Sequence, residues 1–284
     1  MTPSNLKKED ISNIDKLTDV VEKAGNMLLK KFHARNQNHL NGIDTGVAVE
    51  KSERELVIQE DLLSEKMIIN EIKNLDPGAV IYSEEKNNTN LLPDDNSAYK
   101  YILDPLDGTH NFYYGLPYWG IALAVLNELN EAVAGLINIP CLNLFLLNEG
   151  HGSPTFLKQG NGWLKVKTTR RTLEKALICY DNQFHRLGER AIAIYDILAH
   201  DAFTSRITGS AAADAALIAT GRINGRIWNS TVSYDIAAGI PIVLGAGGFV
   251  SDFKGNSITV LRRNVIMCSD KFLLKQLIEE IGKT

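Results

Sequence analysis

The sequence has little cysteine, no excess of positive charge and no long apolar run. Its three cysteines, Cys141, Cys179 and Cys268, are widely spaced and form no CxxC pair, which favours free thiols in a reducing compartment. The net charge of −4 provides no basic field for nucleic acid or for an anionic membrane. No run is long enough to span a membrane, and residues 1–13 lack the apolar core of a signal peptide. We therefore expect a cytoplasmic protein with no nucleic-acid or membrane partner.

The pattern of apolar residues predicts two halves with different arrangements of helices and strands. Helical spacing over residues 11–32 and 62–75 predicts two helices, with a polar loop at 33–45. Apolar runs at 119–126, 132–139 and 142–147, joined by short turns, predict an antiparallel meander flanked by those helices. After residue 150 strands and helices alternate, which is typical of an α/β unit. We expect an N-terminal α+β domain with an antiparallel sheet at 1–149, and a C-terminal α/β domain at 150–284.

One stretch between these helices and the meander carries two acids three positions apart. It follows an apolar strand at 99–103 and reads Asp104-Pro105-Leu106-Asp107-Gly108-Thr109-His110-Asn111-Phe112. Proline lacks a backbone donor, so we expect the strand ladder to end there, and Gly108 permits a tight turn. Paired carboxylates at a strand end suit a hard cation such as Mg²⁺, Mn²⁺ or Ca²⁺. The alternative is an Asp-rich turn that only caps the strand.

Further acids occupy strand ends and helix starts elsewhere in the chain. Glu84 follows a predicted strand at 79–82, and Asp61 and Asp235 open predicted helices. Such positions gather functional sites in α/β and α+β folds, although each acid alone also fits a cap or a solvated loop. The turn Gly209-Ser210-Ala211 begins an Ala-rich helix, where backbone N–H groups can face an anion or Ser210 can act as a simple cap.

Residues 104–112 resemble the first signature of the inositol monophosphatase family of Mg²⁺-dependent phosphatases. The second signature of that family is similar to Tyr234-Asp235-Ile236-Ala237-Ala238-Gly239 followed by Gly247-Gly248. Ser83-Glu84-Glu85 resembles the Gly-Glu-Glu element of the family, and Asp61 falls where the family has an aspartate before its second helix. The order and the separations of these segments agree too, so the resemblance covers nearly the whole chain.

The resemblance implies a layered αβαβα sandwich and a homodimer that is often sensitive to Li⁺. It implies two or three Mg²⁺ ions held by Glu84, Asp104, the Leu106 carbonyl, Asp107 and Asp235. It implies that Asp61 and Thr109 orient the attacking water. The substrate contacts that it implies are Asp107, Gly108, Thr109, Gly209, Ser210, Ala211 and Asp235.

The implied activity is hydrolysis of a small polyol or sugar phosphate, with inositol 1-phosphate as the leading candidate. Histidinol phosphatase, 3′,5′-bisphosphate nucleotidase and fructose-1,6-bisphosphatase activities use the same scaffold and stay open. One departure concerns residues 227–231, which include Trp228 and Asn229 and lack the acid that inositol-cleaving members use for substrate hydroxyls. Asn182 is another candidate for a hydroxyl contact. An alternative of a different class is a non-catalytic regulator that binds metal and a phosphorylated ligand.

Overall fold

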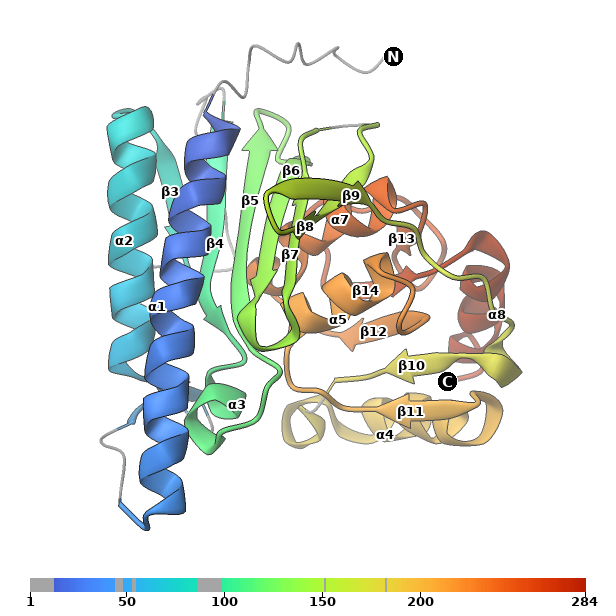
Figure 1. The fold of residues 1–284 in the computed structure, drawn as a ribbon. Coiled ribbons are helices and arrows are strands. Elements are labelled where there is room, and N and C mark those ends of the chain that lie inside the picture. The colour runs from blue at the N-terminus through green and yellow to red at the C-terminus, as the bar shows by residue number, and fades with distance from the viewer. Residues whose placement is uncertain (1–12, 44–47, 53–54, 86–98, 151, 182) are drawn as a thin grey trace.

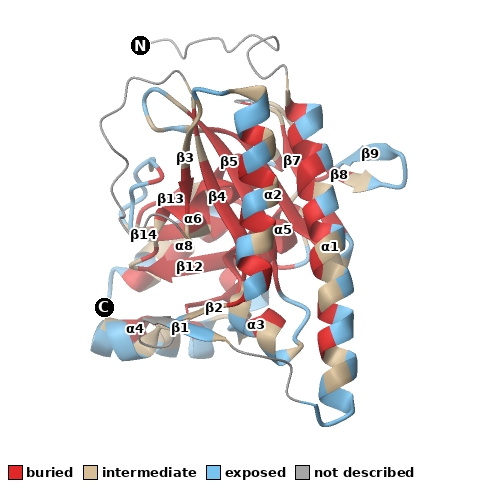
Figure 2. Ribbon diagram, turned by 90° about the vertical axis from the view of Figure 1, so that its left-hand side faces the viewer, coloured by how far each residue is buried: buried red, intermediate tan, exposed pale blue. Residues whose placement is uncertain are grey.

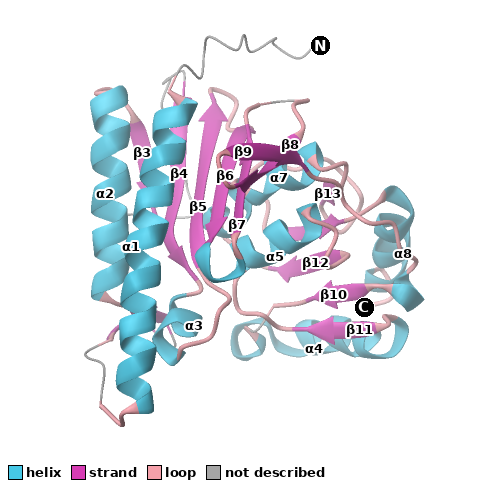
Figure 3. Ribbon diagram, in the orientation of Figure 1, coloured by secondary structure: helices cyan, strands magenta, loops and turns pink. Residues whose placement is uncertain are grey.

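Helices and sheets alternate in five layers (Figure 1, Figure 3). The computed structural model describes residues 13–43, 48–52, 55–85, 99–150, 152–181 and 183–284. A pair of long helices is followed by a seven-stranded sheet, a middle helical layer, a five-stranded sheet and a last pair of helices. This arrangement confirms the predicted αβαβα sandwich. No helix in the described ranges is both long and apolar enough to cross a membrane.

The first layer consists of α1 (Ile14–Leu40) and α2 (Gln59–Leu75), which pack side by side on the seven-stranded sheet. Their apolar stripes are buried against it, as the helical spacing predicts. The predicted loop at 33–45 is wrong for residues 33–40, because α1 continues to Leu40. Arg35 explains the extension: its guanidinium lies 3.7 Å from Glu60 of α2 and 5.1 Å from the ring centroid of Tyr113.

The seven-stranded sheet follows the chain in order, and β5, β6 and β7 are the antiparallel meander that the sequence predicts. Its strands are β3 (Val80–Ser83), β4 (Tyr99–Asp107), β5 (Gly120–Asn127), β6 (Ala132–Ile139), β7 (Leu144–Asn148), β8 (Thr155–Gln159) and β9 (Gly162–Lys165). β3 and β4 pair in parallel and all later neighbours are antiparallel. The short helices α3 (Thr109–Tyr114) and η2 (Pro140–Leu142) connect strands at its ends, and β1 (Val49–Ser52) with β2 (Glu55–Val57) forms a separate hairpin.

The last two strands of this sheet lie beyond residue 149. β8 pairs with β7, and β9 pairs with β8, so the N-terminal sheet extends to Lys165. A division by sheets therefore falls after β9, about fifteen residues beyond the boundary inferred from composition. The division into two domains stays a prediction.

The second sheet has the strand order β11-β10-β12-β14-β13. Its strands are β10 (Leu177–Cys179), β11 (Thr204–Arg206), β12 (Gly225–Asn229), β13 (Phe249–Ser251) and β14 (Asn264–Cys268). The helices α5 (Ala211–Ala219), α6 (Ser233–Ala237) and α7 (Gly239–Gly245) fill the space between the two sheets, and α4 (Phe184–Asp201) with α8 (Lys271–Ile281) covers the outer face, next to the turn η3 (Leu173–Lys175). Most residues of both sheets and of the middle helices are buried, whereas β9 at the edge of the first sheet is exposed (Figure 2). The alanines of α5 allow the close approach that this middle layer needs.

Candidate active site

An extra residue in β4 places its two acids on one face of the sheet. Asp104 is opposite Ala122 of β5, and Asp107 is opposite Gly120, so three steps along β4 match two along β5. Side chains alternate along a regular strand, and residues three apart would face opposite sides without this bulge. Pairing therefore resumes after Pro105, and the prediction that the ladder ends there is wrong. Both carboxylates consequently face the middle helical layer.

Two further segments bring acids to the same point. Glu84 follows β3, and its backbone N–H donates to the Leu103 carbonyl at 3.2 Å, which sets Glu84 beside Asp104. Asp235 lies in the first turn of α6, which packs against β4. Carboxylate oxygens of Asp104, Asp107 and Asp235 all lie within 4.8 Å of one another. The charge of Glu84 also acts on Asp104.

The electrostatics of this cluster fit a hard divalent cation. Burial, followed by the charges of Glu84, Asp107 and Asp235, raises the pKa of Asp104 well above its ordinary value. Burial and the charge of Asp107 raise the pKa of Asp235 to about 7. Acids arranged in this way repel one another unless a cation lies between them. The donors are all oxygens, which is the set that Mg²⁺ or Ca²⁺ prefers.

The start of α5 holds Asp107. The N–H groups of Ala211 and Ala212 donate to its carboxylate at 3.1 and 3.0 Å, and the Ser210 hydroxyl donates to it as well. Burial raises the pKa of Asp107, and these three hydrogen bonds oppose that rise. These groups, predicted to hold phosphate, thus hold a metal-ligand candidate in the structure. Direct phosphate contacts from Ser210 and Ala211 stay predictions.

Asp61 and Thr109 form a hydrogen-bonded pair next to the acids. The Thr109 hydroxyl lies 3.0 Å from Asp61 Oδ1 and 3.0 Å from the Leu106 carbonyl, and it donates its single hydrogen to one of them at a time. The Ile58 N–H donates to the other Asp61 oxygen at 2.7 Å and fixes the carboxylate at the start of α2. Burial raises the pKa of Asp61 to about 7, despite these hydrogen bonds.

A cavity of about 440 Å³ contains most of the predicted site. Its lining includes the predicted residues Glu84, Asp104, Leu106, Asp107, Gly108, Thr109, Gly209 and Asp235. Asp61 lies behind Thr109, and the Ser210 and Ala211 donors lie behind Asp107. The predicted residues therefore converge from β3, β4, α2, α5 and α6.

Several cavity residues were not predicted. They are Glu55, Leu56, Asp181, Gln183, His185, Arg186, Ser230, Thr231 and Val232. His110, which belongs to the predicted stretch 104–112, lines the cavity as well. Asp181 lies two residues after the end of β10, so the rule that selected Glu84, an acid just after a strand, would have found it. Trp228 and Asn229 are buried and do not line the cavity, and Asn182 lies outside the described residues. Residues 227–231 supply no acid to the cavity, but Asp181 places a carboxylate in its lining.

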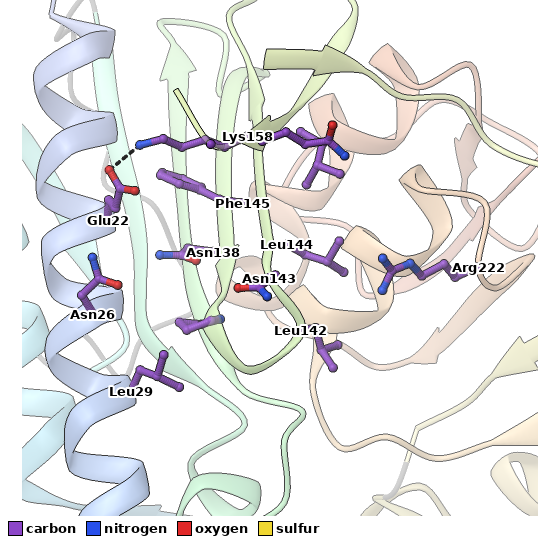
Figure 4. A pocket seen from close by; sticks show the side chains of 14 residues that line it. Glu22, Asn26, Leu29, Asn138, Leu142, Asn143, Leu144, Phe145, Lys158 and Arg222 are labelled. Atoms are coloured by element: carbon purple, nitrogen blue, oxygen red, sulfur yellow. Dashed lines mark hydrogen bonds and ion pairs between the residues drawn. The ribbon is translucent and has the colours of Figure 1, made fainter. Parts of the chain in front are cut away.

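A larger cavity, about 570 Å³, lies between α1 and the β6–β7 turn (Figure 4). Amides and apolar side chains dominate its lining, and Lys158 forms an ion pair with Glu22 at one end, 2.5 Å apart. Among its described lining residues Glu22 is the only carboxylate, so this cavity lacks the acid cluster that a cation site needs.

Comparison with known proteins gives one consistent result. Residues 10–284 match the inositol monophosphatase family. The chain is 32% identical over 263 residues to a Nus factor SuhB of Haemophilus influenzae, covering 91% of each chain. It is 29% identical over 236 residues to an inositol-1-monophosphatase of Mesorhizobium japonicum, covering 82% of this chain and 85% of the relative. The structure of the extragenic suppressor protein SuhB from Bartonella henselae superposes with a TM-score of 0.81 at 26% identity, covering 96% of this chain and 99% of that one.

Proposed function

This chain belongs to the inositol monophosphatase family, and on that premise we propose that it is a Mg²⁺-dependent phosphomonoesterase. Its substrate is a small polyol or sugar phosphate, with inositol 1-phosphate as the leading candidate. The observation that carries the proposal is the convergence of three aspartates within 4.8 Å, beside the hydrogen-bonded pair of Thr109 and buried Asp61. A cavity of about 440 Å³ admits a substrate of this size.

The acid cluster is the proposed metal centre. Glu84, Asp104, the Leu106 carbonyl, Asp107 and Asp235 are the proposed ligands for two or three Mg²⁺ ions. Bound Mg²⁺ would neutralise the phosphate dianion and the leaving oxygen and lower the pKa of bound water. The chain contributes the position of the ligands: the bulge in β4 aims Asp104 and Asp107, and the start of α5 immobilises Asp107.

The Asp61–Thr109 pair is the proposed water-orienting group. When the Thr109 hydroxyl donates to Asp61, its oxygen accepts a hydrogen bond from the attacking water. The water proton passes to Thr109 as the Thr109 proton passes to Asp61, and the water oxygen bonds to phosphorus while the P–O bond to the ester oxygen breaks. The ester oxygen leaves with the bonding electron pair and takes a proton from solvent, and Asp61 later releases its proton to solvent. A carboxyl with its pKa raised to about 7 suits a base that works near neutral pH. In-line placement of the water supplies much of the remaining catalysis.

A panel of phosphomonoesters with Mg²⁺ tests the proposal. We expect phosphate release from inositol 1-phosphate or a related polyol or sugar phosphate, abolished by a chelator. The panel also includes histidinol phosphate, 3′,5′-bisphosphate nucleotides and fructose 1,6-bisphosphate, and so ranks the alternative activities. Absence of release from every ester would contradict the proposal.

That negative result would favour the second candidate, a non-catalytic regulator that binds metal and a phosphorylated ligand. Similarity to relatives named Nus factor SuhB favours it. The Asp61–Thr109 hydrogen bond argues against it, because binding alone needs no group that orients water. A cytoplasmic location and a homodimer stay predictions, and sedimentation of the purified protein tests the dimer.

A further inference from the structure

Arg186 is a cation at the mouth of an otherwise acidic cavity. It is the only Lys or Arg among the described residues that line the proposed active site. The cavity residues Glu84, Asp104, Asp107, Asp181 and Asp235 carry the opposite charge. Neither metal binding nor orientation of the water requires a guanidinium at this place. Its position therefore points to a role toward the substrate.

The present partner of Arg186 is readily exchanged. Its guanidinium lies 3.3 Å from a carboxylate oxygen of Glu55, and the two side chains are 53% and 49% exposed. Glu55 belongs to the β1–β2 hairpin, which lies next to α4 (Figure 2). Solvent-exposed ion pairs of this kind contribute little, because water screens them and both long side chains lose freedom. A phosphate or carboxylate on a bound substrate could compete with Glu55 for the guanidinium, which binds such groups in a two-pronged geometry.

The turn that carries Arg186 is separated from the rest of α4. Gly188 interrupts the helix with φ 63° and ψ −153°, a conformation that is essentially restricted to glycine. The first turn thus presents His185 and Arg186 to the cavity as a unit, while the remainder of α4 packs on the second sheet. Arg190, on the other side of Gly188, lies over the ring of Phe253 at 5.7 Å and does not line the cavity.

We propose that Arg186 binds a second anionic group of the substrate, a phosphate or a carboxylate, at the mouth of the cavity. The inference rests on the proposed phosphomonoesterase activity and refines its substrate class. Esters that carry a second anion are favoured over otherwise identical esters that lack it. Glu55 occupies Arg186 when no such substrate is bound.

Two matched substrate pairs test this assignment. Fructose 1,6-bisphosphate against fructose 1-phosphate tests a second phosphate, and 2-phosphoglycerate against glycerol 2-phosphate tests a carboxylate. We expect Arg186→Gln to raise KM for the doubly anionic member about tenfold more than for its partner, as loss of a charge-assisted hydrogen bond implies. Glu55→Gln should lower KM for the doubly anionic member. Arg190→Gln, on the same helix, is the control and should leave the ratio of KM values unchanged.

Equal effects of Arg186→Gln on both members of each pair would overturn the inference. If both members of each pair are hydrolysed with equal KM values, the role of Arg186 is refuted and the proposed function still stands. If no ester is turned over, the proposed function fails, and equilibrium titration of the same pairs in the presence of Ca²⁺ decides the inference. Tighter binding of the doubly anionic member that Arg186→Gln removes supports it, and equal binding contradicts it.

Discussion

Asp104, Asp107 and Asp235 are held close together by the backbone, with carboxylate oxygens within 4.8 Å of one another. Burial and mutual repulsion raise the pKa of Asp104 and of Asp235. Such an arrangement is unfavourable in itself and becomes favourable when a cation binds. Substitution of a single aspartate of this cluster therefore tests metal binding directly.

Replacing Asp235 by asparagine should abolish tight Mg²⁺ binding and hydrolysis while the fold is retained. The amide keeps an oxygen that can accept the hydrogen bond from Thr231, which is 2.8 Å long in the structure, but it lacks the charge. Calorimetric titration with Mg²⁺ and circular dichroism measure the two effects. Asp196→Asn, on the exposed side of α4, is the control. Unchanged Mg²⁺ affinity in the Asp235→Asn variant would refute the role of this aspartate as a ligand.

Substitutions of Asp61 and Thr109 should impair catalysis without impairing metal binding. We expect Asp61→Asn and Thr109→Val to lower kcat by roughly 10²-fold or more, the usual contribution of a proton-transfer group. Mg²⁺ affinity should change little, because neither side chain belongs to the proposed ligand set. Thr109→Ser retains the hydroxyl and should recover most of the activity. A loss of metal affinity that parallels the loss of kcat would show that the pair acts through the metal centre instead.

At the scale of elements, the turn from β4 into α3 depends on a glycine. Gly108 has φ +80°, and a Cβ there would lie 2.6 Å from the Tyr118 carbonyl oxygen. Gly247 has φ +86° with no atom within 4 Å of such a Cβ, so it shares the backbone strain without the clash. We expect Gly108→Ala to lower the free energy of unfolding by about 1 kcal/mol or more beyond the effect of Gly247→Ala. Urea unfolding measures both, and equal losses would contradict this explanation.

A buried ion pair joins α5 to β12. Arg226 and Asp214 are 4% and 0% exposed and lie 2.5 Å apart, and Thr208 donates to the same aspartate at 2.8 Å. Arg226→Met leaves a buried carboxylate without its cation and should cost about 3–5 kcal/mol of unfolding free energy. The double replacement with Asp214→Leu removes the unpaired charge and should recover part of that loss. If the double variant is as unstable as the sum of both single variants, the pair is not coupled as described.

The element boundaries show where sequence patterns are informative. The long helices and the meander have clear periodicity, and the structure confirms them. The last turns of α1 have no apolar pattern, so the sequence does not predict them. Contacts of Arg35 with Glu60 and Tyr113 stabilise them instead. The bulge in β4 is invisible to propensity, since it depends on pairing with β5. The sequence therefore identifies Asp104 and Asp107 as candidate ligands, but it does not predict the bulge that places both on one face of the sheet.

At the scale of the whole molecule, the packing of elements that are distant in the sequence determines which residues line the same cavity. Glu84 and Asp235 were selected because strand ends and helix starts meet in such folds. Arg186 and Glu55 could not be selected, because their proximity depends on how α4 packs beside a separate hairpin. Asp181 could have been selected by the rule used for Glu84.

Folding stability should also depend on pH and on metal. Asp61 and Asp235 have pKa values of about 7 in the fold against an ordinary 3.8, so the folded chain retains their protons over a range in which the unfolded chain has lost them. Their contribution to stability is present below about pH 4 and is lost as the pH rises to about 7, by an amount on the order of a few kcal/mol. In a chelator, Tm of the wild type should fall over this range more steeply than Tm of Asp61→Asn or Asp235→Asn.

Mg²⁺ should reverse this loss, and its stabilising effect should grow as the pH rises toward 7. Thermal unfolding with and without Mg²⁺ at each pH measures the difference. A stabilisation by Mg²⁺ that is equal in the wild type and in Asp235→Asn would place the ion elsewhere.

The most direct test of the acid cluster is to locate a bound metal. Crystals grown with Mn²⁺ and inorganic phosphate allow the ion to be found by its anomalous scattering. The account predicts two or three Mn²⁺ peaks bounded by Glu84, Asp104, Asp107 and Asp235, with phosphate in the same cavity. Mn²⁺ bound only to other acids of the chain, with none at this cluster, would contradict it.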